Sequence, residues 1–202
     1  MSHHYRQQHL PFNDMFQLCK IGVLPHKFLQ LNNPNISLLC PTCIFSKQKR
    51  TPWRHTSAIS HIRKQIHNFP GAKVSIDQFV SKHPGLIPRI SGKNTTARII
   101  GGTIYIDHYS NKLFCHLHTS LNTEQTLQSK IEFERHAYQH GINIKSYHAD
   151  NGRFAELSFK QAVQNANQTI TYCAVNAHHQ NGIIERGIGI IISWERTLLI
   201  HS

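Results

Sequence analysis

Residues 74–80 read Val74-Ser75-Ile76-Asp77-Gln78-Phe79-Val80. This alternation of apolar and polar side chains predicts a β-strand with one buried face. The acid at its centre is unusual, because Asp is disfavoured inside a strand unless its charge has a use. A loop rich in Pro and Gly is expected next, over residues 83–88. The stretch therefore predicts the first strand of a sheet, with a carboxylate that has a function.

Strand-like and helix-like patterns alternate in the residues that follow. A helix is predicted at 123–139, where Leu127, Ile131 and Tyr138 are spaced for one apolar face. The other predicted elements are a hairpin with strands at 103–106 and 112–117, strands at 143–147 and 169–174, and helices at 155–165 and 180–199. Strands that form a meander and then alternate with helices predict a mixed α/β sheet.

Three acids stand at positions where such a sheet could use them. Asp77 lies inside the first strand, Asp150 directly follows a short strand, and Glu185 lies in the first turns of the last helix. The carboxyl edge of an α/β sheet is where binding sites form. Three carboxylates brought together there could hold two Mg²⁺ or Mn²⁺ ions, which prefer hard oxygen ligands and serve phosphodiester chemistry. Spacing alone leaves open that the three are ordinary surface acids.

One pair of cysteines is close in the sequence, Cys40 and Cys43, as Cys-Pro-Thr-Cys. Two histidines precede it, His4 and His9, and two imidazoles with two thiolates make the closed tetrahedral set that structural zinc prefers. Residues 1–55 carry few large apolar side chains, so this segment needs a bound metal ion to stabilise its fold. A redox motif or two buried free thiols are the alternatives, although a redox CxxC usually lies by a βαβ unit. His3 could replace His4 as a ligand.

The charge of the chain is strongly positive and uneven. Its 202 residues hold 22 Lys or Arg against 10 Asp or Glu, a net charge of +12. Residues 1–70 hold nine of the bases and one acid, Asp14. This excess predicts a polyanion partner, most commonly nucleic acid, with a basic surface kept for solubility as the alternative. No apolar run approaches the roughly 20 residues that a bilayer requires, and no secretory signal is evident, so an intracellular protein is expected.

Several separate motifs resemble copia-type retrotransposon polyproteins and occur in that family's order. The zinc-binding pre-integrase segment of the family is similar to His4-Tyr5-Arg6-Gln7-Gln8-His9-Leu10, Gly22-Val23-Leu24-Pro25, the Cys40–Cys43 motif with Lys47, and Pro52-Trp53-Arg54. The integrase core that follows is similar to residues 74–79, Pro84-Gly85-Leu86-Ile87-Pro88, Asp107-His108-Tyr109-Ser110, Tyr147-His148-Ala149-Asp150-Asn151-Gly152 and His178-His179-Gln180-Asn181-Gly182-Ile183-Ile184-Glu185-Arg186. The similarity covers nearly the whole chain.

The resemblance implies a retroviral-type integrase with a ribonuclease-H-like α/β core. Asp77, Asp150 and Glu185 would form the triad that binds Mg²⁺ or Mn²⁺. Asp107 would have a structural role or would contact the metal-binding residues without binding the metal itself. Residues 1–56 would form a small helical zinc module, with His4, His9, Cys40 and Cys43 as its ligands. Residues 57–72 would be a linker, and 73–202 the catalytic core.

The resemblance also implies the reaction and the partners. Such an enzyme joins the 3′ ends of element cDNA to target DNA, acts as a homo-multimer, and works in the nucleus on host DNA. DNA contacts are expected from basic residues near the zinc motif and from the last helix: Lys47, Lys49, Arg50, Arg54, Asn181, Arg186 and Arg196.

Departures from the family pattern keep a second interpretation open. The chain ends 17 residues after Glu185, so the core is expected to be incomplete at its C-terminus, and Gly187 and Gly189 weaken the last helix. The alternative is a catalytically inactive, zinc-dependent nucleic-acid-binding remnant of such an element. A different polynucleotidyl enzyme, such as a ribonuclease H or a DNA transposase, is a third possibility, against which the zinc segment and the copia-like motifs argue.

Overall fold

The structure, a computed structural model, describes residues 2–33, 38–47, 68–87, 96–174 and 181–201. The chain divides into two compact units. The first comprises Met1–Ser60 together with Gly189–Ser202, and the second comprises His61–Ile188. Helix α6 (Gly182–His201) contributes residues to both units. Among the described residues, no helix combines the length and hydropathy that crossing a bilayer requires.

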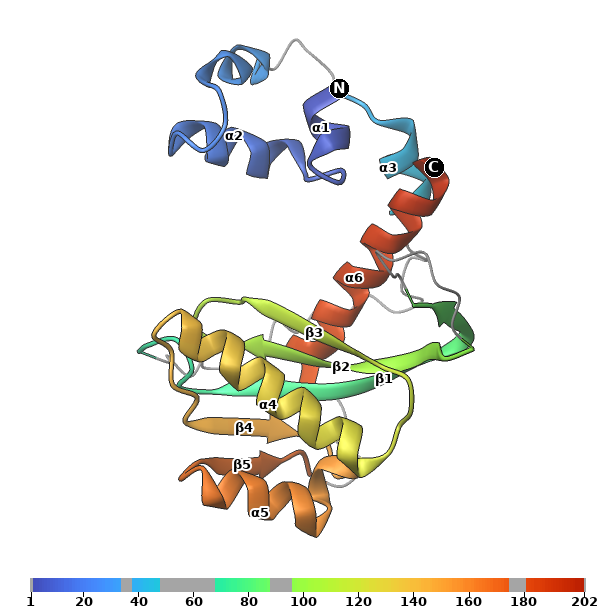
Figure 1. The fold of residues 1–202 in the computed structure, drawn as a ribbon. Helices are drawn as coiled ribbons and strands as arrows, with labels where there is room; N and C mark the ends of the chain where they lie inside the picture. The colour runs from blue at the N-terminus through green and yellow to red at the C-terminus, as the bar shows by residue number, and fades with distance from the viewer. Residues whose placement is uncertain (1, 34–37, 48–67, 88–95, 175–180, 202) are drawn as a thin grey trace. The chain divides into compact units, whose positions relative to one another are not determined.

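A mixed five-stranded sheet forms the second unit, in the order β3-β2-β1-β4-β5 (Figure 1). Strand β1 pairs antiparallel with β2 and parallel with β4, while β2–β3 is antiparallel and β4–β5 is parallel. The strands are β1 (Val74–Leu86), β2 (Arg98–Asp107), β3 (Leu113–His118), β4 (Ser146–Ala149) and β5 (Thr169–Tyr172). The predicted mixed α/β sheet, with an antiparallel meander before its parallel strands, is confirmed.

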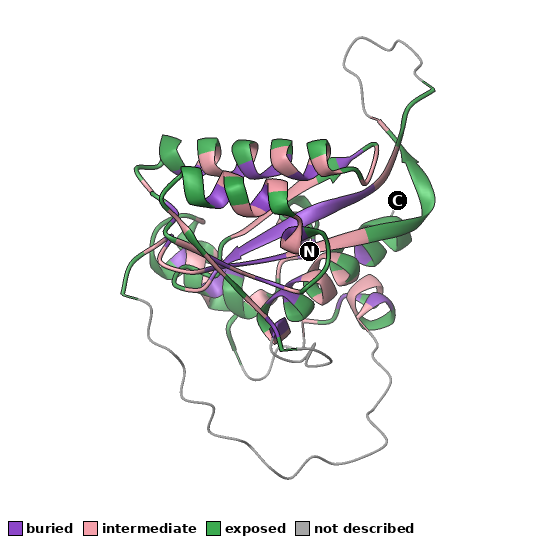
Figure 2. Cartoon of the chain, turned by 90° about the horizontal axis from the view of Figure 1, so that it is seen from below, coloured by how far each residue is buried: buried purple, intermediate pink, exposed green. Residues whose placement is uncertain are grey.

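Helices α4 (Thr123–Gln139) and α5 (Leu157–Asn165) supply apolar side chains to the core of this unit. Helix α4 has the predicted bounds, and its N-terminus is capped by Asn122, whose side chain accepts a hydrogen bond from the Gln125 amide. A short 3₁₀ helix, η2 (Arg153–Ala155), precedes α5. The core contains eleven buried residues: Val74, Ile76, Tyr105, Phe133, Ala137, Ile144, Tyr147, Ala149, Phe154, Phe159 and Val163. The outer sides of the helices are exposed, while much of the sheet is buried (Figure 2).

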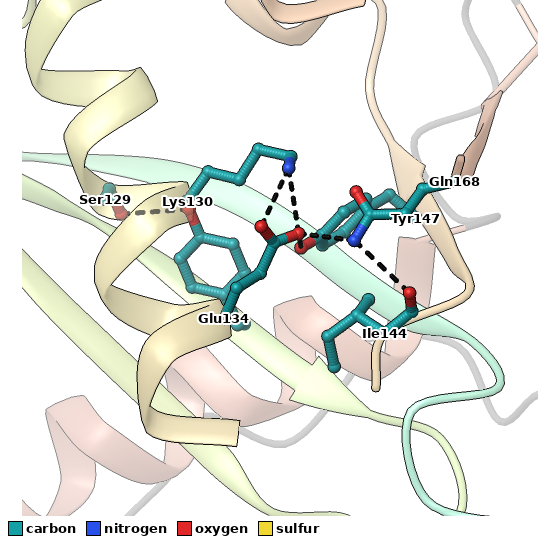
Figure 3. Close-up of polar contacts among 7 residues, drawn as sticks. Ser129, Lys130, Glu134, Ile144, Tyr147 and Gln168 are labelled. Atoms are coloured by element: carbon teal, nitrogen blue, oxygen red, sulfur yellow. Dashed lines mark hydrogen bonds and ion pairs between the residues drawn. The ribbon is translucent and has the colours of Figure 1, made fainter. Parts of the chain in front are cut away.

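The predicted apolar face of α4 is wrong in part. Ile131 is 56% exposed and Tyr138 is 73% exposed, whereas Lys130 is only 4% exposed. Lys130 tolerates this burial because its ammonium donates to both carboxylate oxygens of Glu134, at 2.8 and 2.9 Å. The Tyr147 hydroxyl and the Gln168 amide also donate to Glu134 (Figure 3). The inward face of α4 is therefore partly polar, with an ion pair that connects it to β4 and to the start of β5.

Strand β1 also continues where a loop was expected. Its pairing with β2 resumes at Gly85 and Leu86 after a register shift that begins at Val80. Pro84 has no amide hydrogen to donate, and a bulge is where a strand tolerates such a residue. The shift absorbs the Pro/Gly sequence without ending the strand.

The described part of the first unit contains four short helices and the end of α6. They are α1 (Ser2–Arg6), α2 (Phe12–Lys20), the 3₁₀ helix η1 (His26–Leu31) and α3 (Pro41–Ser46). Helix α2 buries three apolar residues, Met15, Phe16 and Cys19. The predicted division into 1–56, 57–72 and 73–202 stays a prediction, since compactness groups 189–202 with the first unit.

Two candidate metal centres

The first centre lies where the carboxyl end of β4 adjoins the first half of β1. These strands are parallel, with Val74 opposite Tyr147 and Ser75 opposite His148. The same register, extended by two residues beyond the paired positions, sets Asp150 opposite Asp77. Neighbouring strands of a sheet lie about 4.8 Å apart. Asp150 follows the last residue of β4.

The two acids share one face of the sheet with helix α6. Ile76 belongs to the core that α4 and α5 contribute to, so strand alternation directs Asp77 to the opposite face. On that opposite face Gly187 of α6 lies against Ile106 of β2. Glu185 lies two residues before Gly187, in the first turns of the same helix. The start of α6 thus brings the third acid to the face that carries the other two.

The surroundings of Cys173 relate this thiol to all three acids. Cys173 follows β5, and its amide donates to the Ala149 carbonyl at 2.9 Å. Burial, first of all, raises the pKa of the Cys173 thiol, and the charges of Asp150, Asp77 and Glu185 raise it further. The charges of all three carboxylates therefore act on the pKa of this one thiol. Cys173 is a residue of this site that sequence reasoning missed, although its place directly after a parallel strand was the available signal.

The acids do not form a closed set of ligands. Among the described residues, the His/Cys group below is the one set whose ligand atoms lie close enough to share an ion. Asp77 Oδ1 accepts from the Gln78 amide at 2.8 Å, and Asp150 Oδ1 accepts from the Gly152 amide at 3.2 Å. Asp77 and Asp150 are half-buried and Glu185 is exposed, so the three carboxylates face solvent that a cation can enter.

Asp107 has a structural role, as predicted. It pairs with Val74, three residues or about 10 Å along the strand from Asp77. Its carboxylate accepts hydrogen bonds from the Gly71 amide at 2.9 Å and from both the amide and the hydroxyl of Ser110, at 2.8 and 2.6 Å. These bonds close the turn after β2 and fasten residue 71 to it.

The second centre lies in the first unit. Ligand atoms of His4, His9, Cys40 and Cys43 all lie within 4.8 Å of one another, and the first three residues are buried. Cys43 Sγ is 3.4 Å from His4 Nε2 and 3.5 Å from His9 Nδ1, and Cys40 Sγ is 3.5 Å from the same His9 nitrogen. His3 instead packs on Phe28, so the structure selects His4 over His3.

Local structure explains how these ligands meet. Gln8 and His9 both adopt left-handed backbone conformations, with φ of 51° and 60°, which turn the chain back after α1. The His9 amide then donates to the His4 carbonyl at 2.8 Å. Cys40 is the N-cap of α3, so Cys43 follows in its first turn and the two thiols share one side.

The donor set fits zinc. Burial, above all, lowers the pKa of both His4 and His9, which keeps the imidazoles neutral as metal ligands must be. The other nitrogen of His4, Nδ1, bonds the Leu10 carbonyl at 2.9 Å, which fixes the ring with Nε2 toward the cysteines. Two neutral imidazoles and two thiolates are the donors of a tetrahedral N₂S₂ zinc site, and these four atoms lie within 4.8 Å of one another.

The residues predicted to contact DNA differ in their settings. Lys47 is half-buried and donates to the His9 carbonyl at 3.4 Å, directly beside the His/Cys group. Arg186 and Arg196 are exposed on α6. Asn181 is only 4% exposed, and its amide donates to the Ile76 carbonyl at 3.4 Å. Burial argues against Asn181 as a direct DNA contact. Lys49, Arg50 and Arg54 lie outside the described residues.

Comparison with known proteins gives no relative by sequence. No protein-family model matches the chain, and no curated protein matches it. A chain of the simian T-cell lymphotropic virus intasome, solved in complex with PP2A regulatory subunit B56 gamma, matches with a TM-score of 0.51 at 17% identity. That match covers 94% of this chain and 57% of the other, so the chain spans little more than half of its length.

Two integrase core structures match less closely. The HTLV-2 integrase catalytic core domain in complex with magnesium has a TM-score of 0.42 at 14% identity, covering 61% of this chain and 69% of that one. The catalytic core domain of BIV integrase has a TM-score of 0.41 at 11% identity, covering 57% and 63%. The intasome match, with the strand order and the helices described above, shows a ribonuclease-H-like α/β fold of the integrase-core type.

Proposed function

We propose that this chain is the integrase segment of a copia-type retrotransposon polyprotein, which joins the 3′ ends of element cDNA to target DNA. The observation that supports the proposal is the parallel pairing of β1, which contains Asp77, with β4, which Asp150 directly follows; Glu185 lies in the first turns of α6. Integrase-type strand transfer needs such a carboxylate site. The integrase-like fold supports the same class of chemistry.

Each acid has a part in the proposed reaction. Asp77, Asp150 and Glu185 hold Mg²⁺ or Mn²⁺, which prefer oxygen ligands. Two ions held by these carboxylates would supply charge stabilisation to the attacking and the leaving oxygen of a phosphodiester displacement. Asp77, set within the sheet, is the rigid ligand. Asn181 positions the start of α6, because its amide anchors that end of the helix to the Ile76 carbonyl directly before Asp77.

The first unit serves DNA binding in this proposal. His4, His9, Cys40 and Cys43 hold Zn²⁺ as a structural ion, and the fold of this small unit depends on it. Basic side chains contact phosphates without sequence preference, on this unit and on α6: Lys47, Lys49, Arg50, Arg54, Arg186 and Arg196. The active form is a homo-multimer on paired DNA ends, in the nucleus of the host cell.

The test is a joining assay on labelled duplex DNA with Mn²⁺. The native chain is compared with Asp150→Asn and with Glu124→Gln, an exposed acid of α4 that is remote in the sequence from all three acids. We expect joining by the native chain and by Glu124→Gln, and loss of joining in Asp150→Asn. Joining that persists in Asp150→Asn contradicts the assignment of the site.

An inactive nucleic-acid-binding remnant is the second candidate, and the open arrangement of the three acids favours it. It predicts no joining under any metal. Salt-sensitive DNA binding would survive Asp150→Asn but would be lost in Cys40→Ser, because the zinc ligand holds the binding unit together.

A further inference from the structure

The C-terminal end of α6 is part of the unit that holds the His/Cys group. Thr197 is fully buried, and its hydroxyl donates to the Ser193 carbonyl at 2.8 Å. That hydroxyl has one hydrogen, so the 2.6 Å bond between Thr197 and Ser46 must be donated by Ser46. Ser46 is the last residue of α3, whose first turn carries Cys43. The helix end is thus hydrogen-bonded to the element that presents the cysteines.

His201 lies one helical turn after Thr197, on the same side of α6. Its ring is 4.5 Å from the ring of Tyr5 and 4.6 Å from that of His9, both at steep angles. Its Nδ1 atom makes a short hydrogen bond with His9 Nε2. Two contacts, spaced by four residues on one helix, therefore reach the helix that carries Cys43 and the ring of His9.

The hydrogen bond between the two rings decides which nitrogen of His9 can bind a metal. His9 Nδ1 faces both Cys40 and Cys43, so it must keep its lone pair for the metal. The proton of the neutral ring then sits on Nε2 and is donated to Nδ1 of His201. A metal-bound histidine nearly always donates its second N–H to an acceptor that fixes its tautomer and orientation. His4 has such an acceptor in the Leu10 carbonyl, and His201 is the counterpart for His9.

We propose that His201 is a positioning residue of the zinc centre, and that the Thr197–His201 side of α6 completes the zinc-binding unit. His201 does not ligate the metal. It holds the His9 ring in the orientation and tautomer that the metal needs. The proposal rests on the zinc site proposed above, and it adds to that site a residue 192 positions away from His9 in the sequence.

The test measures Zn²⁺ affinity of the full chain by competition with a chromogenic chelator, and the absorption spectrum of the Co²⁺-loaded chain. His201→Ala removes the acceptor. His201→Asn keeps one, because the Asn side-chain oxygen can take nearly the place of the His Nδ1 atom. Ile200→Ala is the matched control, since Ile200 is the adjacent residue of α6 and is 54% exposed.

We expect His201→Ala to bind Zn²⁺ about 10- to 100-fold more weakly than the native chain. His201→Asn should recover most of that loss, and Ile200→Ala should bind like the native chain. At saturating Co²⁺ all four proteins should show the same tetrahedral N₂S₂ spectrum, because the four ligands are unchanged. Native affinity in His201→Ala overturns the inference, as does a changed Co²⁺ spectrum, which would make His201 a ligand. If the native chain binds neither ion, the zinc site itself is wrong and the inference falls with it.

Discussion

Gly187 sets how closely α6 approaches the sheet, and replacing it should move the helix that carries Glu185. A Cβ atom at this position would lie 2.1 Å from Cδ1 of Ile106. Ordinary contact begins at 3.4 Å, so the two atoms would have to separate by about 1.3 Å. Ile106 is buried, which leaves its side chain little room to turn away. At Gly189 of the same helix, an added Cβ meets nothing within 4 Å.

These distances predict opposite changes in the free energy of unfolding for Gly187→Ala and Gly189→Ala. Overpacking a buried contact costs about 1–3 kcal/mol, while Gly→Ala inside a helix gains about 1 kcal/mol. Gly187→Ala should therefore lower the free energy of unfolding by about 1 kcal/mol. Gly189→Ala should raise it by about 1 kcal/mol. A helix displaced by about 1 Å also misplaces Glu185, and an error of that size can reduce catalysis about a hundredfold.

Urea unfolding followed by circular dichroism measures the stability of both variants, and the Mn²⁺ joining assay measures their activity. Ile106→Val supplies a rescue, because it removes the atom that the new Cβ would meet. The free energy of unfolding of the double variant Gly187→Ala/Ile106→Val should exceed the value expected from adding the two single effects by about 1 kcal/mol. If Gly187→Ala stabilises the chain as much as Gly189→Ala does, the close approach of α6 to β2 is not real.

Three further outcomes follow from two buried groups, His118 and Lys130, and from the His/Cys group. His118 is fully buried, and burial, with the nearby charge of His116, lowers its pKa to about 4. His118 of the unfolded chain takes up a proton near pH 6.5, so the free energy of unfolding should be full above that pH and fall by up to about 3 kcal/mol as the pH drops toward 4. Urea midpoints measured at several pH values should depend less on pH in His118→Gln than in the native chain. Glu134→Gln leaves the buried Lys130 ammonium without its counter-charge and should lower the free energy of unfolding in urea by about 3 kcal/mol. Adding Lys130→Met to the same chain should recover part of this loss. An unchanged urea midpoint in Glu134→Gln would contradict the buried ion pair. Cys43→Ser should unfold the first unit alone, so limited proteolysis should cut within residues 1–60 and leave 61–188 intact, whereas an uncut chain would show that the unit folds without its metal.

The sheet and the place of its acids were predictable because their signals are local. Alternating side chains identify a strand, and an acid directly after a strand lies at the sheet edge where sites form. Placing Asp150 opposite Asp77 requires that β1 and β4 be parallel neighbours and that their register continue beyond Ser75 and His148. The His/Cys group was predictable for a chemical reason, since two histidines and a CxxC motif supply the four donors that a zinc site needs.

The remaining features depend on partners far away in the sequence. Lys130 faces inward because Glu134 neutralises its charge, while Tyr147 and Gln168 donate hydrogen bonds to the same carboxylate, and helical periodicity does not contain that information. The part played by His201 depends on a ring 192 positions earlier. Strand β1 passes through Pro84 because a bulge removes the need for its missing amide hydrogen, and the local Pro/Gly composition predicts the opposite.

Binding of Mn²⁺, measured by electron paramagnetic resonance as the loss of the free-ion signal, tests whether the three acids form one metal site. The native chain should bind Mn²⁺, and Asp77→Asn, Asp150→Asn and Glu185→Gln should each weaken binding at least about tenfold, because each removes one charged ligand. Glu124→Gln should bind as the native chain does. Binding that is unchanged in the three substituted chains, or absent from the native chain, would show that these carboxylates share a face of the sheet without sharing a metal.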